Sequence, residues 1–97
     1  MEIKGGIMNL ILCNDIQENV VEVIHRESQG INGYRIVFIN EYSLSIVKGD
    51  QTYSDSDTFE IALIKDGSLV KTFGQAGVLG HQSLEDIRKV CLEVIKL

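Results

Sequence analysis

Hydrophobic and polar residues alternate most clearly in the second half of the chain, from Tyr42 onward. Residues 42–47 read YSLSIV, so Tyr42, Leu44 and Ile46 point to one side of an extended chain and the two serines to the other. A period of two is typical of a strand whose sheet has one solvated face. We therefore predict a strand over Tyr42–Val47.

The run Phe59–Phe73, FEIALIKDGSLVKTF, predicts a hairpin that turns at Asp66 and Gly67. This dipeptide suits a two-residue type I′ turn, because both central residues of that turn need positive φ. The turn sets four facing pairs: Lys65 with Ser68, Ile64 with Leu69, Leu63 with Val70, and Ile61 with Thr72. It also sets the core face, which we expect to carry Phe59, Ile61, Leu63, Val70 and Thr72.

Two further strands are predicted nearer the start of the chain. Tyr34–Ile39, YRIVFI, is apolar enough for both of its faces to be partly covered, and a turn follows at Asn40 and Glu41. Ile7–Cys13 is short and apolar, and its length suits a strand better than a helix. We expect Met1–Gly6 to be a loosely ordered lead-in.

Residues 15–27 fit two structures. Asp15 and Glu18 have the spacing of a capping box, and apolar residues follow on one helical face. Several of those residues, Val20 and Val23 among them, are β-branched, which favours a strand. We favour the helix and keep the strand as the alternative. Gly30 and Gly33 are then expected to bracket a loop.

The C-terminal residues predict an amphipathic helix. Gly74–Gln82 carries three glycines and is expected to be a loop. Ser83 is a good N-cap, with Asp86 three residues later to complete a capping box. An apolar stripe then follows at helical spacing and should pack on the sheet; it consists of Leu84, Ile87, Cys91, Val94 and Ile95.

These elements together predict an α+β fold in one domain that spans residues 1–97. We expect an antiparallel sheet of three to five strands with the C-terminal helix packed on one face. If residues 15–27 are helical, an N-terminal helix packs on the same face.

The net negative charge of the chain disfavours nucleic acid as a direct partner. The chain has 14 acidic residues and nine Lys and Arg, which gives a net charge of −5. Direct binding of nucleic acid needs a basic face, so we do not expect it. No apolar run approaches about 18 residues and no signal peptide is evident, so we expect a cytoplasmic protein that does not span a membrane. Cys13 and Cys91 are expected to be reduced thiols.

The sequence contains no recognised catalytic motif. A nucleophile needs a base beside it, and the available side chains are His25, His81, Cys13 and Cys91. Cys91 lies on the apolar stripe, where a thiol is buried and inert. A His25–Cys13 dyad is the less favoured reading. We therefore predict no catalytic residue and no cofactor.

An acidic loop separates the strand at Tyr42–Val47 from the hairpin. Its carboxylates could hold Ca²⁺ or Mg²⁺, but they lack the register of a calcium-binding loop, so we predict no metal site. An exposed tyrosine among acids is a common type of protein contact. The predicted partner-binding residues are Asp50, Tyr53, Asp55 and Asp57.

From Tyr42 onward the chain resembles a group of small proteins of tailed bacteriophages and prophages. The shared pattern is YSLSIVKG at Tyr42–Gly49, TYSDSD at Thr52–Asp57, FEIALIKDG at Phe59–Gly67, and VLGH leading to QSLEDIRKV at Val78–Val90. Asp55 and Asp57 stand where that group usually has glycines. The resemblance implies an accessory phage protein, made in the bacterial cytoplasm, that acts by binding.

Three functions follow from these observations. The first is a non-enzymatic binding protein that inhibits or modulates a host or defence-system protein and that could form a homodimer through a sheet edge. The second is a small-molecule binder or minor enzyme with a site between the sheet and the N-terminal segment. The third is an acidic mimic of nucleic acid.

Overall fold

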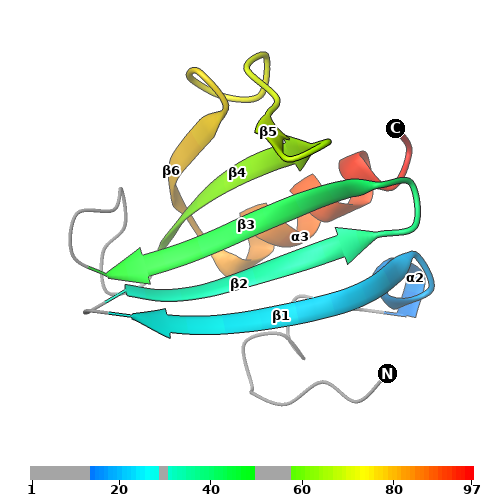
Figure 1. Cartoon of the computed structure of the whole chain (residues 1–97), viewed down its shortest axis with the longest axis horizontal. Helices are drawn as coiled ribbons and strands as arrows, with labels where there is room; N and C mark the ends of the chain where they lie inside the picture. The colour runs from blue at the N-terminus through cyan, green and yellow to red at the C-terminus, as the bar shows by residue number, and fades with distance from the viewer. Residues whose placement is uncertain (1–13, 29–30, 50–57) are drawn as a thin grey trace.

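A computed structural model describes residues 14–28, 31–49 and 58–97. Its elements, in chain order, are α2 (Asn14–Gln17), β1 (Val20–Ser28), β2 (Ile31–Phe38), β3 (Tyr42–Gly49), β4 (Phe59–Lys65), β5 (Ser68–Leu69), β6 (Val78–Gln82) and α3 (Leu84–Val94). The fold is the predicted α+β class, with one antiparallel sheet and a C-terminal helix (Figure 1).

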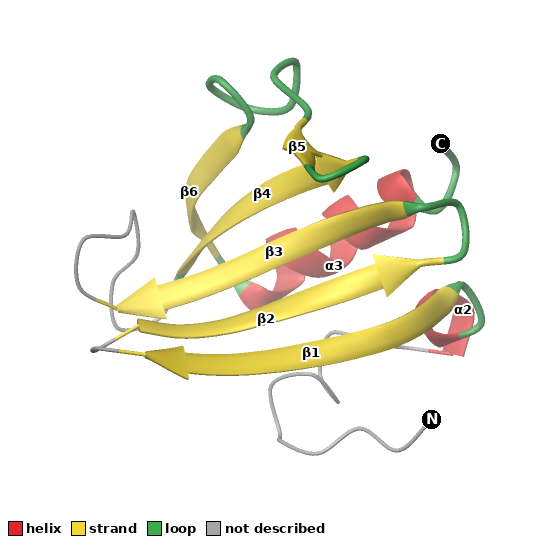
Figure 2. Ribbon diagram, viewed as in Figure 1, coloured by secondary structure: helices red, strands yellow, loops and turns green. Residues whose placement is uncertain are grey.

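The sheet is a meander in the order β1, β2, β3, β4, β5, and β6 also pairs with β4. β5 and β6 share the outer edge of β4, because β5 pairs with Ile64 and Lys65 while β6 pairs with Phe59–Ala62. The described residues thus form six strands, one more than the upper end of the expected range. Figure 2 shows α3 crossing one face of this sheet.

The helix favoured for residues 15–27 is wrong beyond its first turn. α2 ends at Gln17, and β1 begins at Val20 and pairs with β2 along its length. The β-branched side chains decided the outcome, because they pack well on a pleated surface and lose freedom in a helix. Gly33 is also not in a loop; it lies in β2, opposite Arg26 and Val47.

The hairpin is confirmed at its turn and corrected beyond it. Asp66 and Gly67 have φ of 53° and 78°, and Lys65 faces Ser68 and Ile64 faces Leu69 as predicted. β5 ends at Leu69, however, so the expected pairing of Ile61 with Thr72 does not form. Ile61 faces Leu79 of β6 instead.

The predicted loop Gly74–Gln82 is wrong in its second half, where β6 forms. Gly74 and Gly77 have φ of 58° and 95°, which lets the chain reverse and return to the edge of β4. The register shifts between Phe59 and Ile61, where β6 bulges. Pairing with β4 thus overrides the local preference of three glycines for a loop.

The predicted C-terminal helix is confirmed together with its cap. Ser83 Oγ accepts a hydrogen bond from the amide of Asp86, and Asp86 Oδ2 accepts one from the amide of Ser83. Ile87, Cys91 and Val94 of the stripe are buried against the sheet. The sheet contributes these buried residues to the core: Val20, Ile36, Phe38, Leu44, Ile46, Phe59, Ile61 and Leu63.

Several expectations concern residues outside the described ranges, among them the strand Ile7–Cys13, the lead-in Met1–Gly6, the state of Cys13 and the loop boundary at Gly30. No helix among the described residues is long and apolar enough to cross a membrane.

Candidate functional site

An apolar groove of about 410 Å³ lies between the C-terminal half of α3 and the β4–β5 hairpin. We call it the hairpin groove. It opens on the side of the sheet that α3 covers. Its lining residues are Tyr42, Leu63, Val70, Thr72, Phe73, Val90, Glu93, Val94 and Leu97.

The short strand β5 is the reason that the groove exists. β5 ends at Leu69, and residues 71–74 form a turn in which the amide of Phe73 donates to the carbonyl of Val70 over 3.0 Å. The amide of Gly77 in turn donates to the carbonyl of Phe73 over 2.9 Å. The amide of Val70 still donates to the carbonyl of Leu63 on β4 over 2.9 Å, and the chain then leaves β4. Val70 and Phe73 therefore form a wall beside α3.

The other wall comes from α3, and the floor from the sheet. Val90, Val94 and Leu97 follow one another at spacings of four and three, so they share one side of the helix end. Leu97 is 61% exposed and extends that side into solvent. Tyr42 and Leu63 lie on the core face of neighbouring strands and form the floor.

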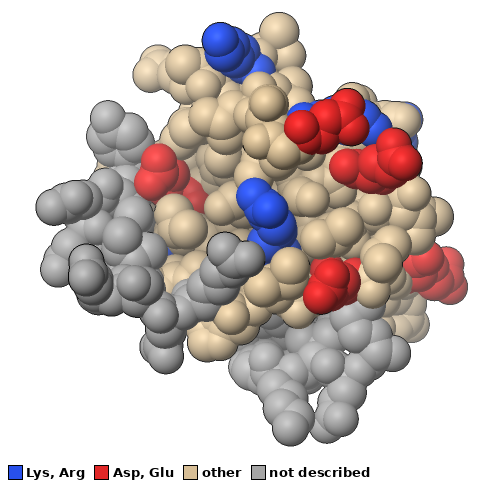
Figure 3. Space-filling view, in the orientation of Figure 1, with Lys and Arg blue, Asp and Glu red and all other residues tan. Residues whose placement is uncertain are grey.

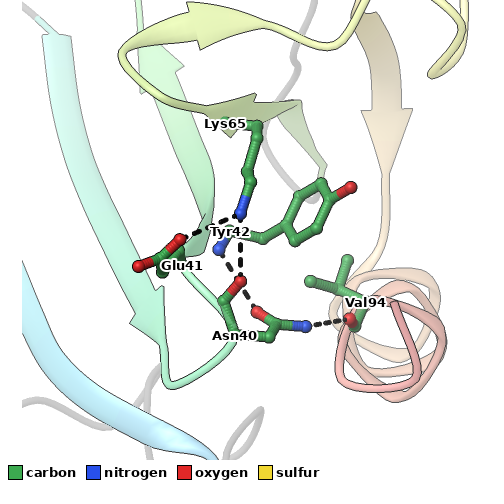
Figure 4. Close-up of polar contacts among 5 residues, drawn as sticks. All are labelled: Asn40, Glu41, Tyr42, Lys65 and Val94. Atoms are coloured by element: carbon green, nitrogen blue, oxygen red, sulfur yellow. Dashed lines mark hydrogen bonds and ion pairs between the residues drawn. The ribbon is translucent and has the colours of Figure 1, made fainter.

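The amino group of Lys65 holds the Tyr42 ring in place. It lies 4.9 Å from the ring centroid, donates to the main-chain carbonyl of Asn40 over 3.2 Å, and lies 3.3 Å from Glu41 Oε2 (Figure 4). The positive charge of Lys65 is therefore paired within the protein, with Glu41 and the ring of Tyr42. A cation over a tyrosine face contributes on the order of 0.5–1 kcal/mol at such exposed sites.

Asn40 fixes the helix end relative to this cluster. Its side-chain amide donates to the carbonyl of Val94 over 2.8 Å, and its Oδ1 accepts from the amide of Tyr42 over 3.2 Å. Figure 4 shows the side chain of Asn40 reaching α3 from the β2–β3 turn. One residue thus connects the floor of the hairpin groove with its helical wall.

Glu93 is the acidic group at the rim of the groove. It is exposed, and no Lys or Arg among the described residues lies within ion-pair distance of its carboxylate. The hairpin groove can therefore take an apolar group whose end carries a positive charge.

The predicted partner-binding residues Asp50, Tyr53, Asp55 and Asp57 lie outside the described ranges, so the structure does not place them. Glu60, the next acidic residue after that loop, belongs to β4 and faces Val47 of β3.

The histidines do not meet at the hairpin groove. His25 stacks on Tyr34 with ring centroids 4.6 Å apart, and its Nε2 lies 2.5 Å from Asn32 Oδ1. His81 is exposed on β6. Cys91 is fully buried on α3, as predicted. No group of three potential metal ligands occurs in residues 14–28, 31–49 and 58–97.

The sequence interpretation missed the hairpin groove. The predicted core face did not include Phe73, and the predicted helix stripe included neither Val90 nor Leu97. A second stripe, Val90, Val94 and Leu97, was the available signal for another apolar contact. Nothing in the sequence pattern could show that β5 ends early, because that depends on where β6 joins β4.

Comparisons with known proteins found no family model, no curated protein and no solved structure that matches the chain.

Proposed function

We propose that this protein acts by binding another protein and that the hairpin groove receives an apolar side chain of that partner. The observation that carries the proposal is the apolar hairpin groove itself, which is open to solvent. The contacts of Lys65 and Asn40 hold its floor at Tyr42. Binding energy in protein interfaces concentrates where an aromatic or aliphatic anchor fills such a pocket.

The partner segment should carry a basic residue beside its apolar anchor. Glu93 stands at the rim with no cation among the described residues at ion-pair distance, and the chain as a whole has a net charge of −5. Complementary charge at the rim steers the encounter and adds specificity more than affinity. Lys65 does not oppose such a partner, because its charge is paired with Glu41.

The kind of partner comes from the resemblance to small phage proteins. We propose a non-enzymatic phage-type accessory protein in the bacterial cytoplasm that inhibits or modulates a host or defence-system protein. The acidic loop residues Asp50, Tyr53, Asp55 and Asp57 are proposed as a second contact with the same basic partner. Fold and origin alone do not fix a function, so both steps need a direct test.

Affinity capture from bacterial lysate tests the proposal with four proteins. We expect the wild type to retain a specific partner, and Val90→Arg and Glu93→Lys to lose it because they block the groove and reverse its charge. Glu85→Lys is the matched control, since Glu85 is an exposed acid on the first turn of α3, outside the groove. Equal capture by all four proteins would contradict the use of the groove.

The acidic loop needs its own variant. A protein with Asp50, Asp55 and Asp57 changed to Asn should bind the captured partner more weakly, with less dependence on salt. Binding that is unchanged in affinity and in salt dependence would remove the loop from the interface and leave the groove proposal standing.

A small-molecule binder is the second candidate function, and the size of the groove favours it. Ligand pockets span roughly 300–1,000 Å³, and the hairpin groove has about 410 Å³. The expected ligand is a small apolar amine, with its ammonium at Glu93. Titration with a series of alkyl and aryl amines, followed by chemical shifts of Val90 and Leu97, tests this function. No shift at millimolar ligand would exclude it.

No observation favours a mimic of nucleic acid. Such a protein gathers carboxylates on one surface at the spacing of phosphates. On the face in Figure 3, the acidic side chains of the described residues form no continuous patch: two lie close together at the upper right, and the others lie in separate places.

A further inference from the structure

The face of the sheet opposite α3 has a composition that differs from an ordinary solvated face. We call it the open face. No described helix lies over it (Figures 1 and 2). Alternation with the buried positions assigns these residues to it: Glu22, Ile24, Arg35, Val37, Ser43, Ser45, Val47, Glu60, Ala62, Ile64, Leu69 and Val78.

Small and β-branched side chains occupy the centre of the open face. The register places Ser45 between Arg35 and Ala62 in one row across the strands. The next row runs from Val37 through Ser43 to Ile64. Because Ser43, Ser45 and Ala62 are short, another flat surface can approach to the spacing of about 10 Å at which two sheets pack face to face.

Two opposite charges stand on the open face without partners. Arg35 and Glu22 are both exposed, and among the described residues neither lies within ion-pair distance of an opposite charge. They occupy diagonal positions on adjacent strands, since Glu22 faces Val37 while Arg35 lies two residues earlier on β2. A two-fold axis that runs parallel to the sheet, midway between two stacked copies, and passes between these residues places Arg35 of one copy opposite Glu22 of the other.

We propose that the open face binds a second copy of this chain and forms a two-fold symmetric dimer. Arg35 of each copy pairs with Glu22 of the other, and the short central side chains of the two sheets pack together. Such an interface is self-complementary, so one surface supplies both partners. This proposal does not rest on the proposed function, because the hairpin groove opens on the α3 side of the sheet.

The dimensions of the molecule suit this dimer. The molecule extends 32 by 30 Å across its two longer axes, and Figure 3 looks down the third, onto the open face. A stable interface buries roughly 800 Å² on each partner, which is within the area of a face of that extent. The charges on the face also disfavour registers in which two like charges meet.

Sedimentation equilibrium of the purified full chain tests the proposal. At micromolar concentration and about 0.15 M salt, where exposed charges are screened beyond about 8 Å, we expect twice the chain mass of 10.8 kDa. Ser45→Arg puts a long charged side chain at the centre of the face and should yield a monomer. A wild type that is monomeric throughout this range, or a dimer that tolerates Ser45→Arg, would overturn the proposal.

Charge reversal tests the pairing itself. Arg35→Glu and Glu22→Arg should each weaken dimerisation by roughly tenfold or more, since each places like charges opposite one another. The double variant should return to within about threefold of the wild type. Glu85→Arg changes the net charge as Glu22→Arg does, but on α3, and should leave the dimer intact. A double variant that stays as weak as the single variants would refute the Arg35–Glu22 pair.

Circular dichroism and urea unfolding of each variant distinguish loss of the dimer from loss of the fold. The substituted residues are exposed or at the solvated side of the sheet, so the monomeric variants should keep their secondary structure. A dimer that survives Ser45→Arg, in folded protein, would point instead to the outer edge of β1, which pairs only with β2 among the described strands.

Discussion

The side-chain amide of Asn40 donates a hydrogen bond of 2.8 Å to the main-chain carbonyl of Val94, 54 residues away in the sequence (Figure 4). Val94 is the last residue of α3, where carbonyls lack partners within the helix, and its carbonyl also accepts from the amide of Leu97 over 3.0 Å. Asn40 lies in the β2–β3 turn, and its Oδ1 also accepts from the amide of Tyr42. The contact therefore ties a turn of the sheet to the end of the helix.

Replacing Asn40 by Ala removes both hydrogen bonds and should lower the free energy of unfolding by about 1–2 kcal/mol. Asn40→Asp keeps the acceptor for Tyr42 but loses the donor, and it puts a negative charge at the negative end of the helix dipole. We expect the loss for Asp to equal or exceed that for Ala. Urea unfolding followed by circular dichroism measures both.

Asn19→Ala is the matched control for that pair of variants. Asn19 also donates its side-chain amide to a carbonyl, that of Asp15 over 2.9 Å, but the bond is local and exposed. It should cost well under 1 kcal/mol, because water replaces the partner. If Asn40→Ala were no more destabilising than Asn19→Ala, the hydrogen bond between the turn and the helix would make no measurable contribution to the free energy of unfolding.

Local signals were enough to predict the elements that agree with the structure. Asp66 and Gly67 adopt positive φ because of their own conformational preferences, and Ser83 with Asp86 satisfies the first amides of α3 without help from other elements. Residues 15–27 and Gly74–Gln82 were mispredicted because their structure depends on strands elsewhere. β1 is held by β2, and β6 by the free edge of β4.

The hairpin groove could not be predicted from the sequence for the same reason. Val90 and Leu97 could be read as an extra apolar stripe, but their partners Val70 and Phe73 come to them only because β5 ends after Leu69. The link from Asn40 to Val94 has no sequence signal at all. The acidic loop residues, which the sequence analysis did single out, lie outside the described ranges.

Two glycines with similar backbone conformations should respond differently to substitution by alanine. Gly67 has φ of +78° and open space around an added Cβ. Gly67→Ala should therefore lower the free energy of unfolding only by the cost of placing alanine in a left-handed conformation, about 1–2 kcal/mol. Gly74 has φ of +58°, and a Cβ there would collide with the main-chain carbonyl of Val78. Gly74→Ala should therefore cost clearly more than Gly67→Ala in thermal unfolding. Equal losses would mean that the turn before β6 can shift freely.

The capping box makes stability depend on pH. The backbone amide of Ser83, followed by its side chain, donates to the Asp86 carboxylate and holds the pKa of that carboxyl below its ordinary value of 3.8. The unfolded chain therefore takes up a proton at higher pH than the folded one. The stabilising contribution of Asp86 is present above that ordinary value and is lost as the pH falls through the lowered pKa.

Asp86→Asn should therefore be less stable than the wild type at neutral pH, and the two unfolding curves should converge as the pH falls below 3.8. Glu85→Gln is the control, since it removes a neighbouring carboxylate without touching Ser83. Ser83→Ala removes the other half of the box and should cost about 1 kcal/mol. A constant difference between wild type and Asp86→Asn at all pH values would contradict this origin of the pH dependence.

The thiol of Cys91 should report the integrity of the contact between α3 and the sheet. Cys91 is fully buried with Ile87 and Val94 against the sheet, so a thiol reagent can reach it only when the helix separates from the sheet. In a Cys13→Ser background, we expect negligible modification of the native protein, with a rate that rises along the urea unfolding curve. Cys91→Ser should cost about 1–3 kcal/mol, because a hydroxyl replaces a thiol in an apolar site. Rapid modification of the folded protein would show that α3 leaves the sheet far more readily than its packing indicates.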